Sequence, residues 1–357
     1  MLPYVMLAAY TGFVSLLNCR GYVGRKGFLV AVMVPACSLL ALRGPSVGED
    51  TSMYLHMARI AGGMPWSSLS TIFGSVIWNM DEWGFGSSVN VGYLVFCKLL
   101  LGLVNSPKFV QVVCAVLTFI GFGRFIYRKE ENVALSYWVF LCGGMFMFAF
   151  NGMRQMLAFA LAIQSFVSLD EKRYIGTAIW ILLGSLIHTS TLIVFALLVL
   201  SVVLKNGRAF VPVLVGCIMM PVLMPVLRVL AAMISAQYAS YFENNYWDAS
   251  VGGMVFVWIL ALICLAIVAK RDESSDGRIV SAMTAVYLSF SVMAFGVSIF
   301  ERVALYPQVF TLLLYPRALK LVGEKNRWWF CALIVSLLFL LFVSYSMNPM
   351  RLYSTFL

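Results

Sequence analysis

Charge is scarce in this chain. Only 11% of its 357 residues are Asp, Glu, Lys or Arg, whereas a soluble domain carries roughly 25%. Hydrophobic residues make up 62%. These proportions exclude a soluble globular protein and indicate a polytopic membrane protein. Lipid offers the backbone no hydrogen bonds, so spans must be helices or a closed barrel, and long apolar runs without alternation predict an all-α protein.

Motifs that define several other protein classes are also missing. The sequence has no Walker A motif and no GxGxxG motif, which argues against ATP-driven transport. The segments expected outside have no DxD-like acidic pair and no histidine cluster, so no metal and no cofactor are required. The eight cysteines are scattered without a CxxC, which indicates small buried hydrophobic residues. Acidic residues are nearly lacking within the apolar runs, which disfavours a proton relay.

Twelve apolar runs are candidates for membrane-spanning helices. They are residues 3–18, 27–42, 109–126, 133–150, 153–169, 174–188, 190–204, 210–235, 251–269, 279–299, 303–318 and 328–346. The block 174–204 is too long for one ordinary span, so we predict a break at residues 188–190. A further short run, 91–104, contains Lys98.

Basic residues indicate how these runs cross the membrane, because cytoplasmic loops carry an excess of Lys and Arg. Most of the 25 Lys and Arg residues fall in six clusters, which are 19–26, 124–129, 172–173, 205–208, 270–278 and 317–327. All six share one side only if the run 91–104 does not span, so we interpret it as an interfacial or re-entrant helix. This predicts twelve spans with both termini outside. It also explains the net charge of +10 without a nucleic-acid partner.

Most of the non-membrane sequence lies in one expected periplasmic loop, residues 43–90. Residues 54–64 have the pattern of a short amphipathic helix, and the loop has tryptophans suited to a bilayer interface (Trp66, Trp78 and Trp83). No other segment is long enough for a soluble domain. We therefore predict a single transmembrane domain over residues 1–357, with polar residues concentrated at the outer ends of the spans.

The densest polar cluster, LRGPSVGEDTSMY, directly follows the second run. Arg43 offers planar donors suited to phosphate oxygens, and Gly44 and Gly48 let the backbone approach a ligand closely. Asp50 stands where it can cap a helix that carries Tyr54. In the alternative interpretation, Arg43 is an interface anchor and Asp50 is only a helix cap.

Two further polar positions interrupt the apolar runs. Arg154 and Gln155 open an apolar helix, where an arginine is costly in lipid unless it is paired or faces a cavity. Arg154 either binds an anionic headgroup or reaches to the interface. His188 lies at the expected break. Its imidazole either serves as a base or substrate contact, or packs between helices beside a hydroxyl.

A late run opens with IFERVALYPQ. Glu301 and Arg302 either neutralise each other or, with Tyr306 one helical turn on, hold an anionic or sugar ligand. The aromatic and amide-rich segment 238–248 is a weaker candidate for sugar binding, because an interfacial belt explains it equally well.

The order of these motifs resembles the EpsG/Wzy-type family of bacterial polysaccharide polymerases. The motifs are an RG…G-D-T…Y segment, an RQ that opens a mid-chain helix, an H-S/T break about 33 residues later, and a final ER…Y. Here they are Arg43, Gly44, Gly48, Asp50, Thr51 and Tyr54; Arg154 and Gln155; His188, Thr189 and Ser190; and Glu301, Arg302 and Tyr306. The resemblance runs over most of the chain, and the order of the short motifs is its strongest part. Glu49 departs from it, since the family often has Thr there.

The resemblance implies a GT-C-type membrane glycosyltransferase in the bacterial inner membrane, with its active site facing the periplasm. Donor and acceptor would be oligosaccharides on undecaprenyl diphosphate, held in the lipid bilayer. A growing chain would move from its carrier to the non-reducing end of a repeat unit on another carrier, in exopolysaccharide or O-antigen synthesis. Whether a chain-length regulator binds is left open.

The candidate residues suit this chemistry. Breaking a glycosyl–diphosphate bond builds negative charge on the leaving group, which guanidinium groups stabilise without a metal. The candidates for this role are Arg154 and Arg302, followed by Arg43. The attacking hydroxyl needs a proton acceptor, and the candidates in order are Asp50, His188 and Glu301. Further substrate contacts are expected from Tyr54, Gln155 and Tyr306. Direct displacement would invert the anomeric centre.

Three other functions compete with this one. A flippase for lipid-linked sugars needs basic residues deep within its spans, and only Arg228 is deep here. A membrane acyltransferase needs a cytoplasm-accessible histidine, whereas His188 is expected outside. A ligase that transfers finished glycan shares the polymerase chemistry and stays open as an alternative.

Overall fold

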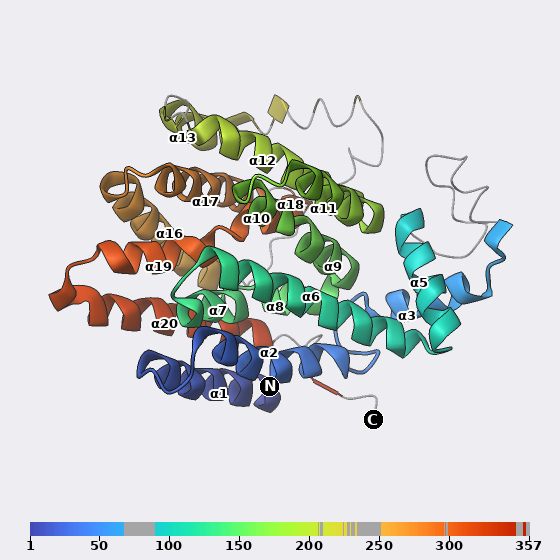
Figure 1. The fold of residues 1–357 in the computed structure, drawn as a ribbon. Coiled ribbons are helices and arrows are strands. Elements are labelled where there is room, and N and C mark those ends of the chain that lie inside the picture. The colour runs from blue at the N-terminus through green and yellow to red at the C-terminus, as the bar shows by residue number, and fades with distance from the viewer. Residues whose placement is uncertain are drawn as a thin grey trace. The chain divides into compact units, whose positions relative to one another are not determined.

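A computed structural model describes residues 1–67, 90–205, 207, 210–223, 225, 226, 229, 233, 251–295, 297, 299–347, 353 and 354. Over these residues the chain is built from helices, as the sequence predicts (Figure 1). Four of the residues and segments considered above lie outside the described residues: Trp78, Trp83, Arg228 and 238–248.

The chain forms two compact units. Unit 1 comprises residues 1–134, 144–194 and 345–357, and unit 2 comprises residues 135–143 and 195–344. The helices of unit 1 are α1 (Leu2–Cys19), α2 (Arg25–Ala41), α3 (Thr51–Gly63), α5 (Val91–Leu103), α6 (Pro107–Lys129), α8 (Met145–Asn151), α9 (Met153–Ala162), α10 (Gln164–Asp170), α11 (Tyr174–Ile187) and the 3-10 helix η2 (Thr189–Thr191). Wholly or mostly in unit 2 are α7 (Val133–Cys142), α12 (Leu192–Lys205), α13 (Phe210–Met219), η3 (Met220–Leu223), α16 (Val251–Arg271), α17 (Ser275–Met293), α18 (Ile299–Gln308), α19 (Thr311–Leu321) and α20 (Glu324–Ser346).

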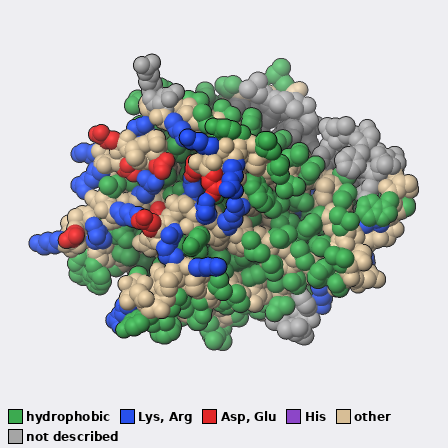
Figure 2. Space-filling view, in the orientation of Figure 1, with side chains coloured by type: hydrophobic (Ala, Val, Ile, Leu, Met, Phe, Trp, Pro, Cys, Tyr) green, Lys and Arg blue, Asp and Glu red, His purple; other side chains and the backbone are tan. Residues whose placement is uncertain are grey.

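Length and composition mark several helices as membrane-spanning. Within the described ranges, α1, α6 and α20 are long and apolar enough to cross a membrane, and α7 with α8 makes a fourth if that bent pair is one span. Hydrophobic side chains also cover much of the face drawn in Figure 2. The chain is therefore a multi-pass membrane protein, in agreement with its composition.

Two breaks in the helices of unit 1 fall at the predicted motifs. α8 ends at Asn151 and α9 begins at Met153, directly before Arg154. α11 ends at Ile187, and the backbone of His188 is extended, with φ −156° and ψ 114°. The predicted break at residues 188–190 is thus confirmed.

Small residues let α9 pack tightly between α6 and α11. A Cβ on Gly121 of α6 would lie 2.6 Å from the carbonyl oxygen of Ala160, and one on Gly184 of α11 would lie 2.9 Å from that of Ala158. Since Gly184 meets Ala158 while Gly176 meets Ser168, α9–α10 and α11 run antiparallel. The turn of α11 that ends at His188 therefore lies level with the first turn of α9.

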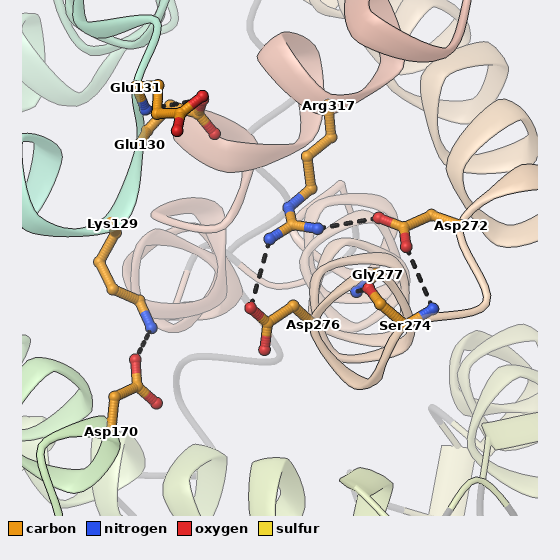
Figure 3. Close-up of polar contacts among 9 residues, drawn as sticks. All are labelled: Lys129, Glu130, Glu131, Asp170, Asp272, Ser274, Asp276, Gly277 and Arg317. Carbon is orange, nitrogen blue, oxygen red and sulfur yellow. Dashed lines mark hydrogen bonds and ion pairs between the residues drawn. The ribbon is translucent and has the colours of Figure 1, made fainter.

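Three basic clusters meet at one end of unit 1. Arg25 donates to the carbonyl oxygens of Tyr127 and Glu130, each at 2.7 Å, and so binds the end of α6. Lys129 pairs with Asp170 at the end of α10 (Figure 3). The clusters 19–26, 124–129 and 172–173 thus adjoin, and their cations satisfy the carbonyls and carboxylates at helix ends.

Unit 2 has a similar charged end. Arg317 of α19 pairs with Asp272 at 2.8 Å and with Asp276 at 3.4 Å (Figure 3). Arg271 donates to the carbonyl oxygen of Leu321 at 2.8 Å, and Arg278 donates to that of Lys205 at 3.1 Å. Lys205 and the clusters 270–278 and 317–327 therefore adjoin within this unit.

Candidate functional site

The polar cluster behind α2 forms a folded loop, residues 43–50, which we call the site loop. Gly48 has φ +86°, a left-handed conformation that glycine adopts without a Cβ penalty. A Cβ there would lie 2.2 Å from the carbonyl oxygen of Phe150, the last residue but one of α8. The close approach that the sequence predicted at Gly48 is thus to the protein's own backbone, at the break before α9. The amide of Glu49 also reaches Asn151 Oδ1, at 3.4 Å.

Arg43 is fully buried and binds the loop from within. Its Nη1 donates to the carbonyl oxygen of Leu40 at 2.6 Å, and its Nε donates to Thr51 Oγ1 at 3.0 Å. Thr51 Oγ1 in turn donates to the carbonyl oxygen of Val47 at 2.7 Å. Burial lowers the pKa of Arg43 to about 10, so the guanidinium stays protonated at neutral pH. Among the described residues, its Nη2 has no hydrogen-bond partner.

Asp50 holds the N-cap position of α3, as predicted, but its carboxylate makes no capping hydrogen bond. The reason lies in the backbone, because Asp50 is helical (φ −99°, ψ 0°) whereas a capping side chain requires an extended N-cap residue. The Asp50 side chain is half-buried, and Tyr54 one turn later packs in a cluster of buried residues with Tyr93 and Met153.

Arg154 and Gln155 lie in the first turn of α9 and are buried, with 8% and 4% of their surface exposed. The Arg154 guanidinium carbon is 5.7 Å from the ring centre of Tyr93, close enough for a cation–π interaction. Arg154 thus directly follows the α8–α9 break. The site loop packs against the same break, where Gly48 contacts the Phe150 backbone. The structure brings the first two motifs together.

His188 comes to the same region from α11. A Cβ on Gly92, next to Tyr93, would lie 2.4 Å from the carbonyl oxygen of Leu186, so α5 touches the end of α11. The His188 side chain is half-buried, and its carbonyl oxygen accepts from the Thr191 hydroxyl at 2.6 Å. The break therefore places a half-buried imidazole at the level where α9 begins.

The last motif lies in unit 2, on α18. Glu301 and Arg302 are exposed near the start of this helix, and Tyr306 is fully buried one turn later. The three residues share one helix, as the sequence predicts, but they differ in exposure. Within the part of the chain that the structure describes, no group of three or more His, Cys, Asp or Glu side chains could hold a metal ion.

A model of the EpsG family matches residues 26–356, which include all four motifs. The chain belongs to the EpsG family. This confirms the resemblance found in the sequence, and EpsG is a family of Wzy-type polysaccharide polymerases. No curated protein and no solved structure matches the chain.

Sequence reasoning missed several residues that pack around this candidate site. Gln111 of α6 is buried, and its amide donates to the carbonyl oxygens of Ala41 and Arg43 at 2.9 and 3.1 Å. A lone glutamine in an apolar run was a signal for such a role. Tyr93 had no signal, because a tyrosine at a membrane interface is common. Lys98, used only to judge the run 91–104, binds the carbonyl oxygen of Met64 at the end of α3.

Proposed function

We propose that this protein polymerises polysaccharide repeat units at the periplasmic face of the bacterial inner membrane. The donor is a glycan on undecaprenyl diphosphate, and the acceptor is a sugar hydroxyl of a lipid-linked repeat unit. The hydroxyl oxygen forms the new bond to the anomeric carbon, and the bond from that carbon to the diphosphate oxygen breaks. The electron pair leaves with the diphosphate, the proton passes to a base, and the anomeric centre inverts.

The observation that carries the proposal is the buried guanidinium of Arg154 at the α8–α9 break. A buried cation suits a diphosphate leaving group, because electrostatic stabilisation is strongest where water is excluded. Arg154 lies beside the Tyr93 ring and level with His188. It comes four residues after Phe150, whose backbone contacts Gly48 of the site loop. Since guanidinium groups stabilise the leaving group in this proposal, it requires no metal ion.

Apart from Arg43, which binds the site loop from within, the other motif residues receive the roles that the sequence suggested. Asp50 is the first candidate for the base, because it is half-buried at the end of the site loop, and His188 is the second. Glu301 and Arg302 on the exposed start of α18 are candidates for binding substrate or accepting the proton. Further substrate contacts fall to Gln155, Tyr54 and Tyr306, within a twelve-span GT-C-like architecture.

The periplasmic orientation is supported by the length of α6. Gln111 binds the site loop near one end of this helix, and Lys129 joins the basic clusters at the other. The intervening 18 residues span about 27 Å at 1.5 Å per residue, close to the hydrocarbon thickness of roughly 30 Å. Basic clusters mark the cytoplasmic side, which puts the site loop at the periplasmic surface in this proposal.

The test is polymer length after purified protein is incubated with undecaprenyl-diphosphate-linked repeat units from the same cell. Wild type is compared with Arg154→Ala and Asp50→Ala, and Arg59→Ala is the matched control because Arg59 is exposed on α3. We expect a ladder from wild type and the control, and none from Arg154→Ala. Thermal unfolding shows whether each variant is folded.

The outcomes separate the alternatives. A ladder that survives Asp50→Ala keeps the polymerase function but transfers the base to His188 or Glu301. No ladder from intact wild type with its native substrate contradicts the proposal and favours a flippase, or a ligase whose acceptor is missing.

A further inference from the structure

A segment far along the sequence binds the site loop. The amide of Gly44 donates to the carbonyl oxygen of Ser354 at 2.7 Å, and the hydroxyls of Ser46 and Ser354 are 3.2 Å apart. The contact between Ser46 and Ser354 joins residues separated by 308 positions. Ser354 comes after α20, the last helix in the described part of the chain, and has no place in the four sequence motifs.

The neighbouring Tyr353 extends this contact to the α8–α9 break. Its ring packs edge-on against Tyr4 of α1 at 6.0 Å, and Tyr4 packs edge-on against Phe150 at 5.7 Å. Arg43 lies over the ring of the same Phe150, 5.6 Å from its centre. Tyr353, Tyr4 and Phe150 therefore form a continuous aromatic row beside the buried guanidinium.

The site loop needs support of this kind. It contains two glycines, and fixing such a backbone costs conformational entropy that local contacts must offset. Part of that support comes from residues close in sequence, because Arg43 donates hydrogen bonds to the Leu40 carbonyl oxygen and to the Thr51 hydroxyl. From the distant end of the chain, Ser354 binds the Gly44 amide and contacts the Ser46 hydroxyl.

We propose that Tyr353 and Ser354 are positioning residues for the transferase reaction. They hold the site loop against the α8–α9 break and thereby fix the distance between Asp50 and Arg154, without touching the reacting atoms themselves. Arg43, buried behind the loop, belongs to the same positioning assembly. This inference rests on the proposed polymerase function.

The first test compares Tyr353→Ala with Tyr353→Phe, which keeps the ring, and with Tyr22→Ala, an exposed tyrosine (75%) away from the site. A displacement of the order of 1 Å lowers rates by up to about 100-fold, so we expect kcat of Tyr353→Ala to fall at least tenfold. KM should change little, because a substrate contact is not lost. Tyr353→Phe and Tyr22→Ala should behave as wild type. Equal kcat for Tyr353→Ala and Tyr22→Ala would overturn the inference.

A disulfide provides a rescue that a general loss of folding would not show. Ser46→Cys and Ser354→Cys introduce thiols where hydroxyls are 3.2 Å apart, within reach of a disulfide. Added to Tyr353→Ala, the oxidised pair should restore kcat, and dithiothreitol should remove it again. A disulfide that forms, as shown by gel shift, but leaves kcat low would contradict the proposal.

A readout independent of the reaction separates this inference from the proposed function. Glu49 is exposed on the site loop, and Cys19 is also exposed. The maleimide label that Glu49→Cys takes up beyond that of the same chain with Glu49 therefore reports the loop's mobility. We expect faster labelling in Tyr353→Ala than in Tyr22→Ala. If wild type makes no polymer, the polymerase proposal fails. The labelling rates then still test whether Tyr353 holds the site loop in place. Equal labelling rates would refute it.

Discussion

Replacing Gly48 with alanine should disable the site loop. The left-handed backbone at φ +86° costs a non-glycine residue about 1–2 kcal/mol. The new Cβ would lie 2.2 Å from the Phe150 carbonyl oxygen, whereas ordinary contact begins at 3.4 Å. The loop or the α8–α9 break must therefore move by about 1 Å, a displacement that can lower a catalytic rate by up to about 100-fold.

The matched control is Gly63→Ala, at the end of α3. A Cβ at Gly63 would meet no atom within 4 Å, so alanine there should be neutral or slightly stabilising. Thermal unfolding and the polymerisation rate are measured for both variants. We expect Gly48→Ala to unfold at lower temperature and to polymerise roughly 10- to 100-fold more slowly. If the two alanine variants match in both measurements, the loop is not held against Phe150 as described.

Three further predictions concern the groups around the site and the charged ends. Arg43→Lys keeps the charge but loses the planar guanidinium, and we expect the free energy of unfolding to fall by about 1–3 kcal/mol; an unchanged unfolding curve would contradict this. Lys98→Met removes the donor at the end of α3 and should lower the free energy of unfolding by about 1 kcal/mol. An unchanged unfolding temperature would contradict this prediction. Burial alone would raise the pKa of Asp272, but hydrogen bonds from Ser274 and the pair with Arg317 lower it overall. The advantage of wild type over Asp272→Asn should therefore be complete above about pH 4 and disappear as pH falls through the lowered pKa; a difference that persists unchanged in acid would refute the assignment.

Several features of the site were predictable because they are local. Burial in lipid requires each run to satisfy its own backbone, so apolar runs give helices and polar interruptions give breaks. The breaks before Arg154 and at His188 follow from this, and so does a loop behind the second run. Positive φ at Gly48 accords with the predicted need for glycine in that loop.

The capping role of Asp50 was predicted incorrectly, and the reason is not local. Asp50 makes no capping hydrogen bond, whereas the Thr51 hydroxyl contacts Arg43 and Val47 of the folded loop at the start of α3. Such contacts depend on how residues 43–51 fold back on themselves, which residue preferences do not specify.

By itself, the sequence determined the membrane class, the helical fold, the breaks before Arg154 and at His188, and the family, because hydrophobicity and short motifs act within a few residues. The breaks inside the predicted runs 133–150, 153–169 and 303–318 came only from the structure. Only the tertiary structure decided which motifs meet. It packed the site loop so tightly against the α8–α9 break that a Cβ at Gly48 would lie 2.2 Å from the Phe150 carbonyl oxygen. It also placed Arg154 over the Tyr93 ring. It also joined Ser354 to Gly44 across some 300 residues. Contacts between distant segments arise from packing of whole helices, and no local pattern encodes them.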